Sequence, residues 1–368
     1  MALSSSVYGS VGTPRVYVDY IQYAKAIGHI KEHTINHLTG DANSAWDFNP
    51  IKFSTYQTDS GVGENIHFRT RFANYPYTEF GINRQFANLL STINYYGVLG
   101  HNLGIDANHE ISRTAMVLSG GSDVLSVMDS ATELAGIVGD PHDMRHIGYS
   151  LYEVTGGIAQ QDEYDTARIY FYKNEDNGGF EVGDSVDIGT FTMGRYYDFP
   201  VSPDLSVKLG FSSAGINRKT TIGGSDLTEI TYLKPNWGNH SPWTHISFPG
   251  ISNPLESLWK EDYKIVSYKG KRNWRIKFSY IDKSDMFPQN MEKNMTGDYT
   301  ASPESFDVDT SIISSFLALT LNGTISFLFQ PDNTKQDFAI CKLDKNSLSI
   351  DQVAHGTYSI SMTFSEVW

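Results

Sequence analysis

The chain closes on two stretches rich in strand-forming residues, NGTISFLFQPDNTKQDFAICK at residues 322–342 and SISMTFSEVW at residues 359–368. Their apolar residues are mainly aromatic and β-branched, and Gly, Pro, Asn and Asp stand between the runs, a pattern typical of strands joined by turns. The two stretches therefore predict three strands, over residues 325–330, 337–342 and 359–368. Because Glu366 and Trp368 stand at the end of the last run, we expect this end of the chain to be built into the fold.

The composition of the whole chain extends this strand-rich pattern. It contains 22 Tyr, 20 Phe and 32 Gly among 368 residues. Tyr and Phe favour the half-buried surface of a pleated sheet, and Gly marks turns and bulges. Charged residues make up only 19% of the chain, below the roughly 25% of an average soluble domain. We therefore expect an all-β dominated fold with many loops, of the sandwich or jelly-roll type.

The charge balance bears on the partners of the protein. The chain carries 28 Lys and Arg against 42 Asp and Glu, a formal net charge of −14. Nucleic-acid binding depends on Lys and Arg that neutralise phosphates, and the sequence shows no basic cluster that reverses the balance locally. We therefore expect no nucleic-acid partner.

The cysteine content and hydropathy limit the class of protein further. Cys341 is the only cysteine, so an internal disulfide and a thiolate metal site are both excluded. It lies in an apolar strand pattern and is expected to be a small buried residue. Residues 1–10 lack the basic and apolar regions of a signal peptide. No apolar run approaches the ~18 residues that a membrane span needs, so we expect no membrane span.

Runs of alternating residues separated by turn residues organise the rest of the chain. Its length suggests about two domains of ~100–200 residues each. We predict an N-terminal arm and first strand over residues 1–59, a β-sandwich over residues 60–195, and a C-terminal β-rich domain over residues 196–368. The strands expected outside the closing stretches cover Val16–Ile21, Ile66–Thr70, Ile93–Gly100, Arg168–Tyr172, Val186–Met193, Leu205–Leu209, Ile230–Leu233 and Trp274–Tyr280.

One segment has the periodicity of a helix. Over residues 305–321, the apolar residues Ile312, Ile313, Phe316 and Leu317 recur on one face at the 3.6-residue period. Asn322-Gly323 follows directly and is a typical helix stop. This is the only helix that the pattern predicts convincingly, and it places a single helix in the C-terminal domain.

Short motifs in four segments carry a resemblance to a known family. The segments are Pro14–Gly28, Tyr95–Gly104 with a Gly-His-Asn-Leu turn at residues 100–103, Ile188–Asp204, and a C-terminal block of Trp274–Tyr280 and Phe327–Trp368. They resemble minor structural proteins of tailed bacteriophages that carry a discoidin-like β-sandwich. The resemblance implies a discoidin-like fold for residues 60–195. It also implies a virion component, in the tail more often than the capsid, that is assembled in the host cytoplasm and has no enzymatic activity.

A few aromatic residues are candidates for contacts with other molecules. Trp237 and Trp243 frame a loop that contains Pro and Asn, which makes a core role for both rings harder to explain. Protein interfaces are enriched in Trp and Tyr, so Trp237, Trp243 and Trp368 are candidate assembly contacts. Trp237, Trp243 and Tyr196 are candidate platforms for stacking on sugar rings, although a buried position at the start of a strand explains Tyr196 better.

The sequence offers weak candidates for chemistry. His101 is a candidate ligand or base, but a structural role near the end of a strand fits it better. Asp106, Asn108 and Glu110 alternate like calcium ligands, yet lack the Gly and distal Glu of an EF-hand. His142 and His146 are spaced for zinc but lack a third ligand. We find no nucleophile elbow, zinc-protease helix or phosphate loop. We therefore expect no catalytic residue, no metal and no cofactor.

Together these observations support one main hypothesis and one alternative. The main hypothesis is a tail-tip, baseplate or fibre-attachment protein of a tailed-phage virion, whose partners are other virion proteins and copies of itself. The alternative is an adhesin module that binds glycan on the host surface. A polysaccharide-degrading enzyme has no motif in its favour, although two suitably spaced carboxylates would be enough for one.

Overall fold

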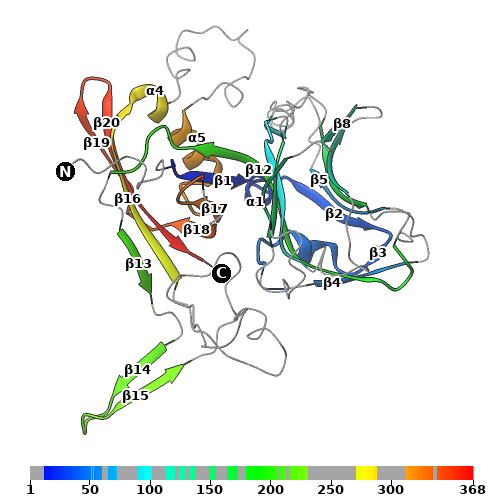
Figure 1. Ribbon diagram of the computed structural model, residues 1–368, viewed down its shortest axis with the longest axis horizontal. Helices are drawn as coiled ribbons and strands as arrows, with labels where there is room; N and C mark the ends of the chain where they lie inside the picture. Colours follow the sequence, from blue (N-terminus) through cyan, green and yellow to red (C-terminus); the bar gives the residue numbers. More distant parts are fainter. Residues whose placement is uncertain are drawn as a thin grey trace, which may run out of the picture.

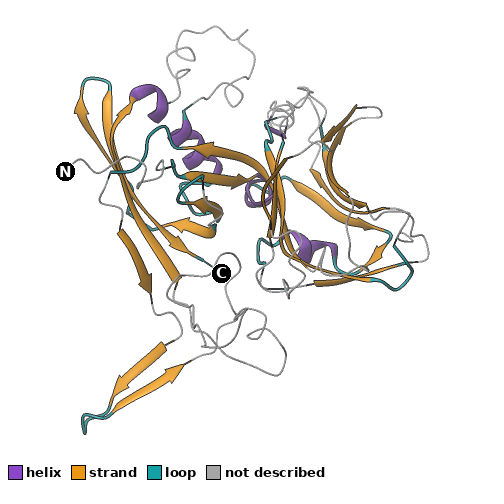
Figure 2. Ribbon diagram, viewed as in Figure 1, coloured by secondary structure: helices purple, strands orange, loops and turns teal. Residues whose placement is uncertain are grey.

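Strands dominate the structure, as Figure 2 shows. The computed structural model describes residues 12–50, 52, 54–59, 65–72, 89–90, 92–101, 113–120, 124–128, 132–136, 149–154, 164–172, 180–204, 208–212, 216–230, 271–287, 311–334 and 338–367. These strands form a large sheet of thirteen strands, a sheet of five strands and a two-stranded hairpin. The expected all-β dominated fold is therefore confirmed.

The large sheet brings together strands from the whole length of the chain. Its strands are β1 (Arg15–Asp19), β3 (Leu38–Thr39), β4 (Ser54–Thr58), β6 (Tyr95–His101), β9 (Thr132–Gly136), β10 (Tyr149–Glu153), β12 (Ser185–Asp198), β13 (Lys208–Ser212), β16 (Lys271–Asp282), β17 (Phe327–Gln330), β18 (Ala339–Leu343), β19 (Ser349–Ala354) and β20 (Thr357–Glu366). The main order is β13-β16-β20-β18-β17-β1-β12-β6-β10-β9. β19 pairs with β20, and β4 joins β3 to β12.

A second sheet packs against part of the first and makes a sandwich. Its strands are β2 (Ile30–Asn36), β5 (Asn65–Phe72), β11 (Thr166–Tyr172), β7 (Arg113–Gly120) and β8 (Val124–Met128), in that order. Phe191 of β12 lies between the sheets, with ring centroids 4.7 Å from Phe68 and 6.0 Å from Phe171. Alternation places these rings inside, because Ile66, Phe68, Thr70 and Phe72 of β5 are buried while His67, Arg69 and Arg71 are partly exposed.

The C-terminal half of the large sheet has its own aromatic core. Helix α5 (Ile312–Leu319) packs on it through Phe316, whose ring lies 4.9 Å from Phe327 and 6.0 Å from Phe364. β16 alternates between buried and more exposed residues, as its sequence predicted, with Trp274, Ile276 and Phe278 buried. Cys341 is a buried thiol in β18, as expected.

Strand β1 occupies the centre of the large sheet (Figure 1). It pairs antiparallel with β12 on one side and with β17 on the other. β12 is fourteen residues long and pairs successively with β4, β6 and β1. The expected domain boundary between residues 195 and 196 falls inside β12.

The expectation of a single convincing helix is wrong. Tyr20 and Ile21 were expected in the first strand, but β1 ends at Asp19 and helix α1 (Tyr20–Ala26) begins. The Asp19 carboxylate accepts hydrogen bonds from the backbone N–H of Ile21 and Gln22, at 2.7 and 2.9 Å, which is an N-cap. A 3₁₀ helix η1 (Ala42–Trp46) and helix α4 (Lys283–Met286) were also missed.

The expected C-terminal helix is confirmed within narrower bounds. Helix α5 ends at Leu319, and residues 305–310 lie outside the described residues. Leu321, Asn322 and Gly323 then adopt positive φ angles of 50°, 57° and 75°. This left-handed turn explains why Asn and Gly follow the helix. A Cβ on Gly323 would also overlap the Leu343 side chain.

Several strand predictions are confirmed, with shifted ends. β5, β6, β11, β12 and β16 coincide with expected strands, and β17, β18 and β20 with the three closing ones. β19 was not expected. Of the expected strand Leu205–Leu209, residues 208 and 209 lie in β13, and residues 205–207 lie outside the described residues. Of the expected strand Ile230–Leu233, Ile230 is the last residue of a strand, and residues 231–233 lie outside the described residues.

Candidate functional site

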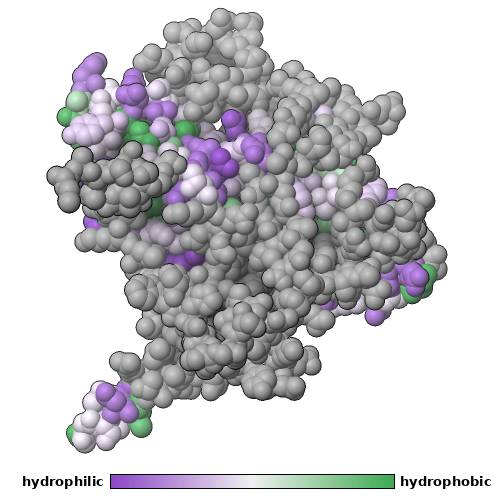
Figure 3. All heavy atoms as spheres, viewed as in Figure 1, coloured by the Kyte–Doolittle hydropathy of each residue, from purple (hydrophilic) through white to green (hydrophobic). Residues whose placement is uncertain are grey.

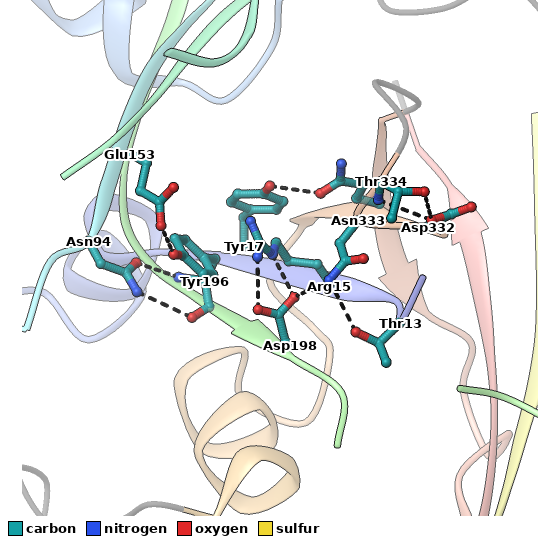
Figure 4. A network of polar contacts seen from close by, with 11 residues as sticks. Thr13, Arg15, Tyr17, Asn94, Glu153, Tyr196, Asp198, Asp332, Asn333 and Thr334 are labelled. Atoms are coloured by element: carbon teal, nitrogen blue, oxygen red, sulfur yellow. Dashed lines mark hydrogen bonds and ion pairs between the residues drawn. The ribbon is translucent and has the colours of Figure 1, made fainter. Parts of the chain in front are cut away.

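The best-formed polar site lies where β1, β12 and the turn after β17 meet (Figure 4). Arg15 and Asp198 are directly opposite each other in the β1–β12 pair. The guanidinium donates from Nε and Nη2 to the two carboxylate oxygens, at 2.7 and 2.8 Å. This two-point geometry is the strongest form of an arginine–carboxylate contact.

The turn after β17 joins this ion pair. The Asn333 side-chain amide donates to Asp198 Oδ1 at 3.1 Å and to Thr13 Oγ1 at 3.2 Å. The Tyr17 hydroxyl donates to Gln330 Oε1 at 2.8 Å. Burial raises the pKa of Tyr17 to about 12, partly offset by Arg15, so its phenol stays protonated at neutral pH. The network therefore ties three distant segments of the chain together.

Tyr196, a candidate sugar platform, is already engaged within this network. The Arg15 guanidinium lies 4.0 Å from the centroid of its ring, and the Tyr17 ring is 5.7 Å away. Its hydroxyl donates to Glu153, and its backbone N–H donates to Asn94 Oδ1 at 2.8 Å. Burial and the hydrogen bond to Glu153 raise its pKa well above the usual value. These contacts give Tyr196 a place in the internal network of the chain.

The other sequence-predicted site residues lie mostly outside the described part of the chain. Trp237, Trp243 and Trp368 fall there, and so do the calcium candidates Asp106, Asn108 and Glu110 and the zinc candidates His142 and His146. His101 is described and buried. It is the last residue of β6 rather than part of the turn beyond, and its Nε2 lies 3.0 Å from Ser150 Oγ on β10.

Two general features of the described residues bear on function. No group of three His, Cys, Asp or Glu side chains in them is placed to hold a metal ion. Among the helices so described, none is long and apolar enough to cross a membrane.

A hairpin projects from the described part of the chain. It consists of β14 (Ile216–Thr220) and β15 (Asp226–Ile230), which among the described strands pair only with each other. Figure 1 shows it extending away from the two larger sheets, and Figure 3 shows apolar atoms at its end. Ile222 in the turn is fully exposed, and Leu227 is 59% exposed.

This hairpin was not among the predicted elements, although the sequence contains a local signal for it. Gly223-Gly224 stands between two short runs of strand-forming residues, and a Gly-Gly pair is a typical hairpin turn. Gly224 has a φ of 82°, which Gly adopts without strain. The turn is closed by Thr221 Oγ1, which accepts from the Ser225 N–H at 3.0 Å.

Comparison with known protein families finds none that matches this chain, and no curated protein matches it either.

Proposed function

We propose that this chain is a structural component of a tailed-phage virion, in the tail tip, baseplate or fibre attachment, and acts by protein–protein assembly. Its partners would be other virion proteins and further copies of itself. The virion assignment rests on the sequence resemblance, and the assembly mechanism on the β14–β15 hairpin. The role needs no catalytic group, metal or cofactor.

The hairpin is the observation that supports assembly best. An isolated two-stranded hairpin is marginally stable in water, and this one pairs with no other described strand. Ile222 in its turn is fully exposed, so this side chain contributes no burial energy to the folded chain. Burying one such side chain against a partner contributes about 1.5–3 kcal/mol. We infer that the hairpin inserts into a neighbouring virion subunit.

A second exposed element suits the same role. All six residues of β19 are exposed, and the strand pairs only with β20 among the described strands. Its outer edge carries backbone groups that another strand can pair with. Exposed Ile350 and Val353 lie on this strand.

The hairpin contact is tested with Ile222→Asp in the phage. We expect the variant chain to fold with unchanged thermal stability, because Ile222 has no packing partner, and to be incorporated into virions at well below the wild-type level. Val182→Asp is the matched control, because Val182 is also largely exposed but lies outside the hairpin. Equal incorporation of both variants would refute the hairpin contact.

The virion assignment is tested separately, by immunogold electron microscopy of purified particles with antibody against the recombinant chain. Label at the tail end supports a tail component. Label on the capsid would still support a virion component, but one located on the capsid and not in the tail. A complete lack of label on intact and disrupted particles would contradict the proposal.

A further inference from the structure

The five-stranded sheet carries a cluster of basic and aromatic side chains on the face opposite its core. In the β5–β11 pair, Arg69 lies opposite Arg168 and His67 opposite Tyr170. These four residues are partly exposed, whereas the residues between them, such as Phe68 and Ile169, are buried in the sandwich. No run of the sequence shows this cluster. Strand pairing creates a cluster from residues that are far apart in the sequence.

Arg168 is the cation of this face that no acid neutralises. Its Nη1 donates to Ser119 Oγ at 3.0 Å, and it forms no ion pair among the described residues. Arg69 instead pairs with Glu32 at 3.2 Å, while Arg71 lies 3.9 Å from Glu32 and 3.5 Å from Asp165. Among the described side chains, the guanidinium groups of Arg69, Arg71 and Arg168 thus lie with two carboxylates, Glu32 and Asp165. These described groups leave one positive charge uncompensated, on a chain whose net charge is −14.

Polar atoms within the cluster also lack hydrogen-bond partners. Nε of Arg69 and Nδ1 of His67 are both excluded from solvent and unpaired. Such atoms carry a cost of about 1–3 kcal/mol each, and a binding site is one reason to retain them. Burial, and then the charge of Arg168, lowers the pKa of His67 to about 4. Its ring is therefore neutral at pH 7 and adds no charge to the face.

Aromatic rings adjoin the uncompensated guanidinium. The rings of Tyr170 and Tyr172 stack with centroids 5.9 Å apart and planes inclined by 19°, and His67 lies 4.6 Å from Tyr170. Among the described residues, none forms a hydrogen bond with the Tyr170 hydroxyl. The Tyr170 hydroxyl can therefore donate a hydrogen bond to a ligand hydroxyl beside Arg168, or accept one from it.

We propose that this face, built from Arg168, Tyr170, His67 and Arg69, binds an acidic glycan. The carboxylate of a uronic-acid-type sugar would accept hydrogen bonds from Arg168, and the sugar ring would lie against Tyr170. An arginine matches a carboxylate in charge and in planar two-point geometry. The site is independent of the assembly role, because it involves neither the hairpin nor β19.

The charge balance favours an acidic glycan over single-stranded nucleic acid. Aromatic residues on a sheet can also stack on bases. A nucleic acid, however, presents a phosphate at every residue and needs several cations along its path. Among the described side chains of this face, only one positive charge is uncompensated. Glu32 lies on the same face, opposite Arg71. A ligand with isolated carboxylates and many hydroxyls fits this balance better.

The test is calorimetric titration of the full-length chain with trigalacturonate and, for comparison, neutral maltotriose. We expect measurable binding of trigalacturonate only, weakened by added salt. Arg168→Gln should weaken it about tenfold or more, since hydrogen bonds between charged groups are the strong ones. Arg168→Lys should retain part of the affinity, and Tyr170→Phe should weaken it severalfold.

Lys219→Gln is the matched control, because it removes an exposed positive charge on the distant hairpin. We expect it to leave binding unchanged. Circular dichroism melts confirm that each variant is folded. The proposal is overturned if trigalacturonate binds no better than maltotriose, if Arg168→Gln and Lys219→Gln have equal effects, or if a short oligothymidylate binds more tightly. The assembly proposal is tested apart from glycan binding by measuring how much Arg168→Gln protein enters virions. Incorporation at the wild-type level would show that the variant loses glycan binding without losing assembly.

Discussion

Arg272 and Glu366 form an ion pair that is almost completely buried, with side-chain exposures of 7% and 0%. The two residues lie at adjacent ends of β16 and β20. Arg272 donates from Nη2 to Glu366 Oε1 at 3.0 Å and from Nε to Oε2 at 3.2 Å. It also donates to the Phe338 carbonyl oxygen at 2.9 Å. The pair therefore ties the end of β20 to β16 and to Phe338, the residue before β18.

Removing one partner of this pair should destabilise the protein strongly. Glu366→Gln leaves the Arg272 charge buried without compensation, and such changes cost about 3–5 kcal/mol. Urea unfolding followed by tryptophan fluorescence measures the loss. The double variant Arg272→Met/Glu366→Leu is the control, because replacing both charges with apolar side chains should recover much of the stability. A loss below about 1 kcal/mol for Glu366→Gln would contradict this account.

Asp19 should make the stability depend on pH. Burial raises its pKa from 3.8 to about 7, although its N-cap hydrogen bonds act in the opposite direction. Between these values the folded state holds a proton that the unfolded state has lost, so the free energy of unfolding falls as pH rises towards about 7 and then levels off. The full effect is on the order of 4 kcal/mol.

Asp19→Asn tests this pH dependence directly. Asn is also a good N-cap, so helix α1 should remain, while the ionisable group is removed. We expect the variant to show a flatter profile of unfolding free energy against pH over that interval. If the wild type and the variant have parallel profiles, another group is responsible for the dependence.

Gly194 should not tolerate a side chain. It lies opposite Asp19 in the β1–β12 pair, and an added Cβ would overlap the Val18 carbonyl oxygen. Because that contact is with backbone, Gly194→Ala should destabilise the protein by about 1–3 kcal/mol. In Gly223→Ala the new Cβ would lie 4.0 Å from its nearest neighbour, Thr221 Oγ1, so thermal melts should show little change. Similar losses for both variants would show that the β1–β12 contact is not responsible.

Cys341 should be unreactive in the folded protein. Its side chain is buried in β18, between β17 and β20. Thiol reagents require an accessible thiolate, so labelling with a chromogenic disulfide should be negligible in buffer and stoichiometric in denaturant. Rapid labelling of the native chain, at the rate of a small-molecule thiol, would contradict the burial of this strand.

Local alternation predicted much of the strand content. In β5 and β16, apolar residues recur at every second position and pack into the core, so sequence periodicity and burial agree. For residues 23–28 the sequence left open a longer strand or one helical turn, and the start of helix α1 was misplaced because Tyr20 and Ile21 also suit a strand. The competing signal was the capping carboxylate of Asp19. A seven-residue helix has too few turns for its periodicity to outweigh strand propensity.

The candidate sites were much harder to predict. The cluster around Arg168 depends on the register between β5 and β11, which no local pattern contains. Tyr196 was recognised as an aromatic residue of interest, but its contacts with Arg15 and Glu153 come from three different strands. Trp237, Trp243 and Trp368 stay predictions, because they lie outside the described residues.

The central position of β1 in the large sheet determines when this strand can pair during synthesis. The ribosome delivers β1 before either of its partners, β12 at residues 185–198 and β17 at residues 327–330. Non-local pairing of this kind slows folding. Both edges of β1 remain open to wrong partners until β12 has been made, and one edge remains open until β17 has been made. We therefore expect the nascent chain to need protection, by a chaperone or by rapid synthesis, until β17 encloses β1.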